Sequence, residues 1–540
     1  MIRRLAVSLT LLLSVAASAQ QIPESVPISL EEATRRALEK NFDITLERET
    51  LLQAREATRG TRGVYDPFLS IDLLYRQHTD PVNSSFSGAP DGDLAPEQKG
   101  FSLDANLAQY LPTGGLVSVG GSASRQETNS IFTPLSPAYY TGLGVDFRQP
   151  FLRDFHSDPN RRAIRVADAR LEGERARLSS TVANTIATVE AQYWTLLAFR
   201  RGVEVLESSV SLADRQLEET KVRVDAGVLA RTDIAQPTAE LERRRGDLAR
   251  AREQVLRSEN ALKSSILLDP RDPLWTKRLV PSDTPPAQRP AADLAQAVED
   301  GLARRPELAE ARAGVEIAAA DLELAQSEVL PRLDLVAGYG SRGMAGRLNP
   351  SFDSPFGPYA IPPQLDGGMG QSWNTLFDQE FPDARIGVSF SIPLGNRQAE
   401  AALATARSLE RQAKLSETEL EQRIVAEVQN AYGALETARQ RVAATRAARE
   451  AAETQLFAEQ ERFGVGLSTN FFVLTRQNDL TSARVDEIQA ILDFTRAETE
   501  LARATGMILD TRKVDVVPLE EPPGEVVSNM PEDSTPRPRS

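Results

Sequence analysis

The sequence contains no cysteine and only two histidines, His78 and His156, among its 540 residues. The missing cysteine excludes disulfides, thiolate metal sites and a cysteine nucleophile. Two isolated histidines do not supply the ligands of a histidine metal site, and the motifs GxSxG, HExxH and the phosphate-binding loop are also missing. We therefore expect a protein that is not an enzyme and has no catalytic residue, no cofactor and no metal.

Positive charge is also scarce relative to negative charge. The chain has 62 Lys and Arg against 77 Asp and Glu, which gives a formal net charge of −15. A nucleic-acid partner would call for clustered Lys and Arg facing its phosphates. The charge balance therefore predicts no nucleic-acid partner.

The first nineteen residues have the three parts of a secretory signal peptide. Arg3 and Arg4 give the positive start, residues 5–17 the apolar stretch, and Ala17 and Ala19 the small residues of a cleavage site. The alternative, an anchoring helix, needs a longer apolar stretch. We expect residues 1–19 to be removed and the rest to be exported.

The remaining sequence contains the same pattern twice. We expect a first repeat over residues 28–268, a Pro-rich linker over 269–290, a second repeat over 291–508, and a disordered tail over 511–540. Matching positions at two offsets carry this interpretation: Leu30 and Leu294, Ala33 and Ala297, Tyr75 and Tyr339, Tyr193 and Tyr432, Gly227 and Gly466.

Each repeat has the same order of predicted elements. A helix comes first, short alternating segments follow, and a very long helix, a glycine turn and a shorter helix complete the repeat. The two shorter helices together match the length of the long one, which predicts paired rods. The predicted helices are residues 29–62, 160–226 and 232–268 in the first repeat and 291–326, 396–463 and 470–507 in the second.

The long helices carry apolar residues at alternating spacings of three and four, which is typical of a coiled-coil seam. Arg200 and Arg439 lie on that seam in the two repeats, and we expect each to pair with an acidic residue. The predicted seam residues, besides these two arginines, are Ile186, Val189, Tyr193, Leu196, Val203, Leu206, Val210, Ala213 and Leu217 in the first repeat and Val425, Val428, Tyr432, Leu435 and Val442 in the second.

The segments between the helices alternate apolar and polar residues, as membrane-spanning barrel strands do. A soluble sandwich with one wet face is the alternative. Long loops rich in Pro, Gly and Ser separate the strands at residues 78–100 and 341–383. The predicted strands are residues 67–77, 142–150, 331–340 and 385–394, and an additional pair at 101–110 and 116–125 leaves four or six strands per chain open.

A few strands cannot close a pore alone. Unpaired backbone groups at a sheet edge in lipid cost several kcal/mol each. The exposed seam of each rod must also be buried against a neighbour. We therefore expect several chains to share one barrel, continued by a ring of helices that encloses a tunnel.

The duplication, the corner Q-P-F-L at residues 149–152 with its partner S-I-P-L at 391–394, and the two glycine turns resemble the TolC-like outer membrane efflux protein family. The resemblance implies a mainly α fold with a membrane β-barrel, formed by a homotrimer and continuous with a periplasmic α-helical coiled-coil tunnel. It implies localisation in the outer membrane of a Gram-negative-type bacterium, in contact with outer membrane lipid. The function implied is a passive exit duct of a tripartite efflux or type I secretion system, with a periplasmic adaptor (membrane fusion) protein and an inner-membrane pump as partners.

The glycine turns are the most informative short motifs. Gly227 and Gly466 are expected to take positive φ where the chain reverses, with Thr232 and Ser468 or Thr469 capping the returning helices. As plain hairpin turns they need no partner. The resemblance implies instead that they form the docking surface for the adaptor, with these contact residues: Gly227, Val228, Leu229, Thr232, Asp233, Gly466, Leu467 and Ser468.

Two neighbouring phenylalanines follow the second turn. Some relatives carry an acidic ring where this chain has Phe472 and Thr475. We hypothesise that Phe471 or Phe472 narrows the tunnel entrance through apolar contact and dewetting. The alternative is that both rings fill the coiled-coil core.

Two other protein classes are alternatives to an exit duct. A periplasmic coiled-coil scaffold or adaptor without a membrane barrel would lack lipid-facing strands. An exported hydrolase would need catalytic motifs, and the abundant Asp and Glu lie mainly on helix faces, where charge serves solvation. The exit duct is the reading that accounts for signal, duplication, strands and rods together.

Overall fold

The computed structural model describes residues 24–79, 81, 88–90, 93–286, 293–354 and 357–514. The predicted signal peptide and most of the predicted tail lie outside the described residues. The strands are β1 (Ser25–Ile28), β2 (Phe68–Thr79), β3 (Glu97–Tyr110), β4 (Leu116–Thr128), β5 (Leu135–Pro150), β6 (Arg278–Pro281), β7 (Arg332–Leu348) and β8 (Phe381–Ser391). The helices are α1 (Leu30–Lys40), α2 (Phe42–Arg62), α3 (Pro159–Asp225), α4 (Ala235–Ile266), α5 (Leu294–Arg304), α6 (Pro306–Glu328), α7 (Met369–Phe377), α8 (Arg397–Gly464), α9 (Asn470–Ala504) and α10 (Ile508–Arg512).

The described residues divide into two compact units. We call the part within Glu47–Leu178 and Pro306–Arg423 the sheet unit. The part within Met1–Leu46, Ser179–Arg305 and Ile424–Ser540 is the hairpin unit. Both long helices, α3 and α8, contribute residues to each unit. Among the described residues, no helix combines the length and the apolar character needed to cross a membrane.

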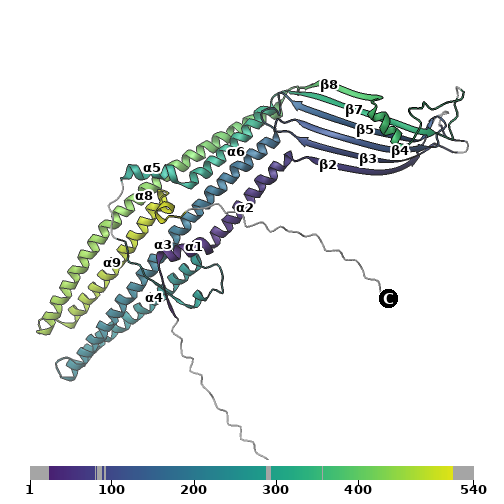
Figure 1. Ribbon diagram of the computed structural model, residues 1–540. Helices are drawn as coiled ribbons and strands as arrows, with labels where there is room; N and C mark the ends of the chain where they lie inside the picture. The colour runs from purple at the N-terminus through teal and green to yellow at the C-terminus, as the bar shows by residue number, and fades with distance from the viewer. Residues whose placement is uncertain are drawn as a thin grey trace, which may run out of the picture. The chain divides into compact units, whose positions relative to one another are not determined.

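The sheet unit is built around a six-stranded sheet in the order β2-β3-β4-β5-β7-β8 (Figure 1). All neighbouring pairs are antiparallel. The first repeat gives four of these strands and the second gives two, so the additional pair predicted in the first repeat belongs to the sheet. The choice between four and six strands is thereby decided for six.

The register of the strands separates two faces, because directly paired residues point to the same side of a sheet. We name the faces by their residues. The apolar face includes Leu69, Ile71, Leu73, Leu103, Leu107, Val119, Leu143, Val145, Tyr339, Ile386, Val388 and Phe390. The polar face includes Ser70, Asp72, Asp104, Asn106, Ser122, Asp146 and Arg385.

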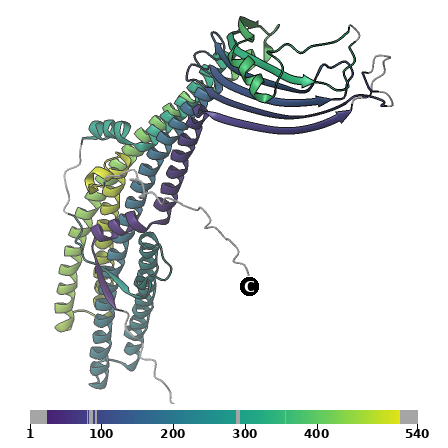
Figure 2. The same cartoon turned by 45° about the vertical axis from the view of Figure 1, so that its right-hand side comes forward.

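The second long loop is shorter than the sequence predicted. The expectation of a loop over residues 341–383 is wrong in two places, because β7 continues to Leu348 and α7 forms within the connection. Figure 2 shows α7 as a short green helix beside the strands. Glycine in β7 permits this approach, because a Cβ atom on Gly343 would collide with the Ser372 carbonyl oxygen of α7.

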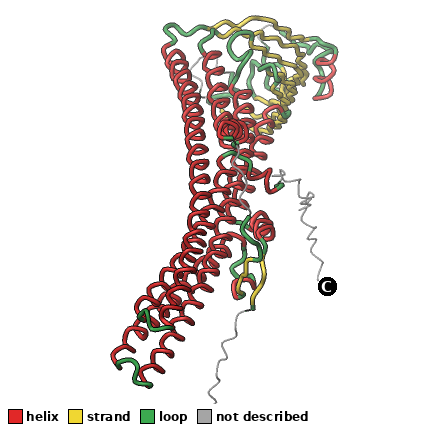
Figure 3. Tube along the Cα trace, turned by 90° about the vertical axis from the view of Figure 1, so that its left-hand side faces the viewer, coloured by secondary structure: helices red, strands yellow, loops and turns green. Residues whose placement is uncertain are grey.

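The hairpin unit contains two helical hairpins, α3–α4 and α8–α9, and a small parallel sheet of β1 and β6 (Figure 3). Tyr193 of α3 is fully buried and joins the small sheet to the helices. Its hydroxyl donates to the Asp283 carboxylate at 2.5 Å, and burial together with this hydrogen bond raises the pKa of Tyr193 to about 12. The surrounding core includes Ile28, Val189, Leu196, Leu262, Ile266 and Leu279.

The first seam is buried as predicted except at Val203, Leu206 and Val210, which are half-buried, and the second seam is shifted at alternate positions. Val428, Leu435 and Val442 are buried, but Ile424, Ala431 and Ala438 take the places predicted for Val425, Tyr432 and Arg439. Both sets fit a seven-residue repeat, and the small alanines allow close helix packing. Arg200 and Arg439 pair with acids as expected, Arg200 with buried Glu259 at 3.2 Å and Arg439 with Glu436 at 3.2 Å.

The first helix of each repeat is interrupted, contrary to the prediction of one continuous helix. Asn41 has extended backbone, and its side-chain oxygen accepts hydrogen bonds from the backbone nitrogens of Asp43 and Ile44, at 2.9 and 3.3 Å. It therefore ends α1 and caps α2. In the second repeat Pro306 begins α6, because proline disfavours helical geometry in the residue before it.

The tail over residues 511–540 was expected to be disordered, but its first two residues are helical. Ile508–Arg512 form α10. The Arg512 guanidinium donates to both carboxylate oxygens of Glu190 at 2.5 and 2.8 Å, and Glu190 is buried. A buried carboxylate needs such a partner, so this ion pair orders the start of the tail. Residues 515–540 lie outside the described part.

Candidate functional site

The first hairpin reverses direction at Gly227. Its φ is +75°, in the left-handed region that favours glycine. The backbone nitrogens of Val228 and Leu229 donate to the Arg223 carbonyl oxygen at 2.9 and 3.3 Å, which closes the end of α3. The prediction for Gly227 is confirmed, and Val228 is left with a side chain 71% exposed.

The second hairpin reverses in the same way at Gly466, with φ +80°. The Leu467 backbone nitrogen donates to the Arg462 carbonyl oxygen at 2.8 Å. Leu467 is 80% exposed. The two turns are therefore matched in geometry, and each presents an aliphatic side chain directly after its glycine.

The predicted caps are wrong in detail. Thr232 lies inside a short 3-10 turn (Arg231–Ile234) rather than at a cap position, and Asp233 accepts a hydrogen bond from the Ala230 backbone nitrogen at 3.1 Å. Thr469 holds the cap position of α9 but makes no capping hydrogen bond through its side chain. Ser468 instead donates to Glu459. At the first turn a carboxylate thus takes over the role predicted for a hydroxyl, and at the second the Ser468 hydroxyl is engaged by Glu459.

One contact joins the two turns. The Arg223 guanidinium, in the last turn of α3, lies 4.3 Å from the centre of the Phe463 ring, in the last turn of α8. A cation over an aromatic face is attracted by the ring quadrupole. The two tips are therefore neighbours within the hairpin unit.

Phe471 and Phe472 begin α9 and stay on its surface. Their rings meet edge to face with centres 5.6 Å apart. They are 55% and 49% exposed, whereas the next two residues, Val473 and Leu474, are buried. The core of this chain is therefore filled without the two rings.

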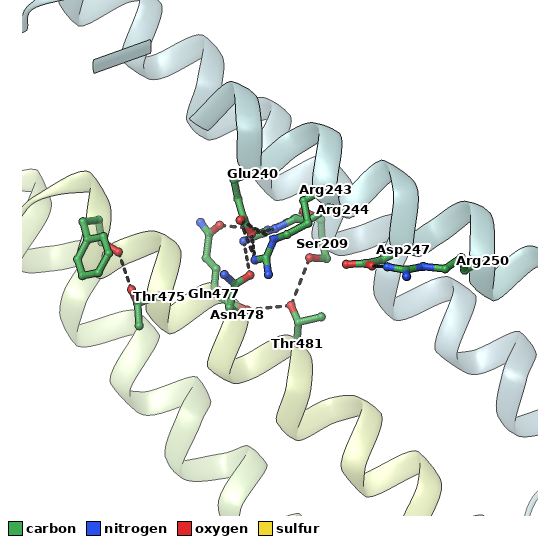
Figure 4. A network of polar contacts seen from close by, with 11 residues as sticks. Ser209, Glu240, Arg243, Arg244, Asp247, Arg250, Thr475, Gln477, Asn478 and Thr481 are labelled. Atoms are coloured by element: carbon green, nitrogen blue, oxygen red, sulfur yellow. Dashed lines mark hydrogen bonds and ion pairs between the residues drawn. The ribbon is translucent and has the colours of Figure 1, made fainter. Parts of the chain in front are cut away.

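A buried arginine, which the sequence analysis missed, connects the hairpins farther from the tips (Figure 4). Arg244 of α4 is 3% exposed. Its guanidinium donates to Glu240 at 2.8 Å, to the Ser209 carbonyl oxygen of α3 at 2.9 Å, and to Asn478 of α9 at 2.8 Å. One side chain thereby ties three helices from both repeats.

The electrostatics of this network are balanced in favour of the ion pair. Burial raises the pKa of the Glu240 carboxyl, but hydrogen bonds from Arg243 and Arg244 outweigh it, and the pKa is lowered overall. Asn470 extends the polar contacts toward the tips, since it accepts from Gln216 at 2.6 Å. The sequence contained a signal for this network. Arg244 lies between Leu241 and Leu248, and Gln477 lies between Leu474 and Leu480, so both polar residues occupy positions of the coiled-coil seam.

Within the described ranges, no cluster of three or more His, Cys, Asp or Glu side chains is arranged to hold a metal ion. The candidate site therefore consists of the two glycine tips, the exposed phenylalanine pair, and the polar network that links the hairpins.

The chain resembles known proteins along most of its length. Residues 103–266 and 297–507 match the family model described as outer membrane efflux protein. The outer membrane efflux protein BepC of Brucella suis is 26% identical over 379 residues, which is 69% of this chain and 74% of BepC. The outer membrane protein TolC of Vibrio cholerae is 23% identical over 458 residues, covering 82% of this chain and 92% of TolC.

The fold is also known. The crystal structure of the Campylobacter jejuni CmeC outer membrane channel matches with a TM-score of 0.62 at 14% identity, and the match covers 88% of this chain and 85% of CmeC. At that identity the likeness concerns the fold. It shows that the strand and hairpin arrangement described above is one that outer membrane channels use.

Proposed function

The chain belongs to the outer membrane efflux protein family, and from that membership we propose that three copies assemble into one passive exit duct. The membership makes it an outer membrane efflux protein. The proposal adds a homotrimer, a β-barrel shared by its chains, and a helical tunnel in the periplasm. It also adds the partners, a periplasmic adaptor and an inner-membrane pump of a tripartite efflux or type I secretion system.

The observation that carries the proposal is the open sheet. β2 and β8 are its two edges, and every residue of β8 is exposed in the single chain. An edge in lipid leaves backbone groups unpaired at a cost of several kcal/mol each. Pairing β8 of one copy with β2 of the next removes both edges and closes a ring, to which each copy contributes six strands.

The two faces of the sheet support the same assembly. Val388 and Ile386 on the apolar face suit contact with lipid, and Asp72 and Asp104 on the polar face suit a water-filled interior. A periplasmic scaffold, the alternative reading, gives no reason for this apolar face.

The absence of native cysteine permits a direct test of edge pairing. The double variant Ile71→Cys with Val388→Cys places one thiol on β2 and one on β8. Oxidation should give cross-linked dimers and trimers on a denaturing gel, and each single variant should stay monomeric. A cross-link within one chain, seen as a faster-migrating monomer, would instead mean that the sheet closes on itself.

We further propose that the two tips dock the adaptor, as the family resemblance implies. Val228 and Leu467 follow the two glycines and are strongly exposed apolar side chains of the predicted contact set. Leu229 is only partly exposed, and Thr232 and Asp233 lie in the adjoining turn. Val228→Asp with Leu467→Asp should abolish efflux in cells at unchanged outer membrane levels. Val228→Ile with Leu467→Ile, which keeps the apolar surface, should preserve efflux.

The exposed phenylalanine pair is proposed to narrow the entrance. Three copies would bring Phe472 side chains around one axis, where apolar rings resist wetting. Phe472→Ala should raise single-channel conductance in planar bilayers, and Phe472→Leu should leave it near the wild-type value. An unchanged conductance in the alanine variant would remove the ring from the constriction.

A further inference from the structure

The short helix α7 lies on the apolar face of the sheet. Thr141 of β5 donates to the Ser372 carbonyl oxygen at 2.9 Å, and Ser341 of β7 donates to the Leu376 carbonyl oxygen at 2.8 Å. Both donors share a face with Leu143 and Val145, because Thr141 pairs with Gly343 and Leu143 with Ser341. The helix therefore covers part of the surface that the proposed function assigns to lipid.

Its position along the strands marks a boundary. On β5 the face runs Phe147, Val145, Leu143 from the end that leads into α3, and these side chains are apolar. The next residue on the same face is Thr141, which α7 covers. The helix thus covers Thr141 and Ser341, the small polar residues directly beyond the apolar run on this face.

The helix also completes the free edge of β7. β8 pairs with β7 only as far as Arg342, so the following β7 residues lack that partner strand. The Thr375 hydroxyl accepts from the Met344 backbone nitrogen at 3.0 Å, and the Gly346 nitrogen donates to the Leu365 carbonyl oxygen at 2.8 Å. These contacts hold α7 and the segment before it against β7.

The side of α7 turned away from the sheet includes an exposed aromatic ring. Ser372, Thr375 and Leu376 are buried, while Phe377 is 67% exposed. Trp373 and Phe377 stack with ring centres 5.9 Å apart and an interplanar angle of 24°. The helix contains no charged residue.

From these contacts we propose that α7 is a membrane-interface anchor, whose Trp373 and Phe377 rings enter the headgroup region of the bilayer beside the apolar face. The inference rests on the proposed function, because it takes that face to meet lipid. Aromatic rings favour the boundary between hydrocarbon and water, and they flank the apolar band of membrane barrels. The continuity of α7 with the apolar face identifies lipid as the occupant, in preference to a neighbouring copy.

Tryptophan fluorescence in vesicles tests the placement, because the chain has three tryptophans. The full mature chain with Trp194→Phe and Trp275→Phe keeps Trp373 as the single reporter. In phosphatidylcholine vesicles, lipids brominated near the headgroup should quench Trp373 about twofold more than lipids brominated near the chain ends. Equal or stronger quenching by the deep label would place the ring in the hydrocarbon and overturn the proposal.

A matched reporter separates this inference from the proposed function. With all three tryptophans replaced by Phe, Ile386→Trp puts the reporter on β8, where the apolar face should be quenched best by the deep label. Quenching at position 386 without quenching at Trp373 would overturn the anchor alone and indicate that protein covers α7. Loss of quenching at both positions would overturn the membrane sheet as well.

A single substitution gives a second test, which does not require the variants with two or more replaced tryptophans to fold. In the otherwise unchanged protein, Trp373→Phe should remove most of the fluorescence that the shallow label quenches, because Trp194 is buried in the hairpin unit. Retention of that lipid-sensitive fluorescence in Trp373→Phe would count against the anchor.

Discussion

At the scale of single residues, Arg244 shows how a buried charge is retained. Its guanidinium is shared among Glu240, Ser209 and Asn478 from three helices. Removing one partner of such a network leaves the others buried without hydrogen bonds, which costs more than the pair itself contributes. The network therefore fixes how the hairpins of the two repeats align.

Arg244→Ala should lower the free energy of unfolding of the detergent-solubilised protein by about 3 kcal/mol. The matched control is Arg243→Ala, which also removes a hydrogen bond to Glu240. Arg243 is exposed, so its loss should cost less than about 1 kcal/mol. Denaturant titration followed by circular dichroism measures both, and equal losses would show that burial does not decide the effect.

Glu47 gives a prediction for pH. Burial raises the pKa of its carboxyl, and Glu174 and Glu310 raise it further while Arg177 opposes them. A raised pKa in the folded state means that this contribution to stability is complete below the ordinary value of 4.5 and is lost as pH rises through the folded pKa. Glu47→Gln should therefore be more stable than the parent at pH 7 and should lose that advantage below pH 4.5.

Thermal unfolding of both proteins across this pH range gives the measurement. Arg177→Gln is the opposite control, because it removes the one favourable charge beside Glu47. It should destabilise the protein most at neutral pH. A difference between Glu47→Gln and the parent that does not change with pH would contradict the assignment.

At the scale of elements, replacing glycine by alanine should have opposite effects on stability within α3 and in the turn directly after it. Gly227 has positive φ, so Gly227→Ala should destabilise the hairpin by about 1 kcal/mol. Gly202 lies within α3 with no atom near a would-be Cβ. Gly202→Ala should therefore stabilise the protein by about 0.5–1 kcal/mol. Equilibrium unfolding of the two variants checks both signs.

The long helices and the strands could be predicted from the sequence because their signals repeat many times. The prediction of residues 160–226 for α3 differs from the structure by one residue at each end. The interruption at Asn41 was missed because one capping side chain is a weak local signal within a strong helical pattern. Pro306 was a visible signal that the apolar periodicity outweighed.

The remaining elements depend on contacts that no local pattern contains. The α7 segment lies in a stretch rich in Gly, Pro and Ser. It becomes a helix by packing against Gly343 and Ser341 of the sheet, which are distant from it in the sequence. The network around Arg244 likewise requires three helices to meet. The glycine tips were predictable, but their caps were not, because Asp233 and Glu459 compete with the hydroxyls as hydrogen-bond partners.

At the scale of the whole molecule, the polar face predicts ion selectivity. Asp72 and Asp104 pair directly across β2 and β3 on that face, and no ion pair joins either of them to a described residue. In the proposed trimer these two carboxylates would form a local ring of negative charge on the interior wall, separate from Arg76 farther along β2 on the same face, and such a ring favours cations. Asp72→Asn with Asp104→Asn should shift the reversal potential in a salt gradient toward zero.

The control is Asp146→Asn with Arg385→Gln, which removes the ion pair between these two residues on the same face and leaves the net charge of the face unchanged. This control should keep the reversal potential of the parent. An unchanged reversal potential in Asp72→Asn with Asp104→Asn would indicate that selectivity is set elsewhere in the duct.

Six strands per chain also bear on where the duct offers electrical resistance. Eighteen tilted strands spaced as in an ordinary sheet enclose a cylinder about 35 Å across between backbones. Because the resistance of an electrolyte column falls with the square of its width, such a cylinder would contribute little to the total. A blocker sized to lodge in the strands would then have to be as large as a small folded protein, and smaller plugs would act only where the helices converge.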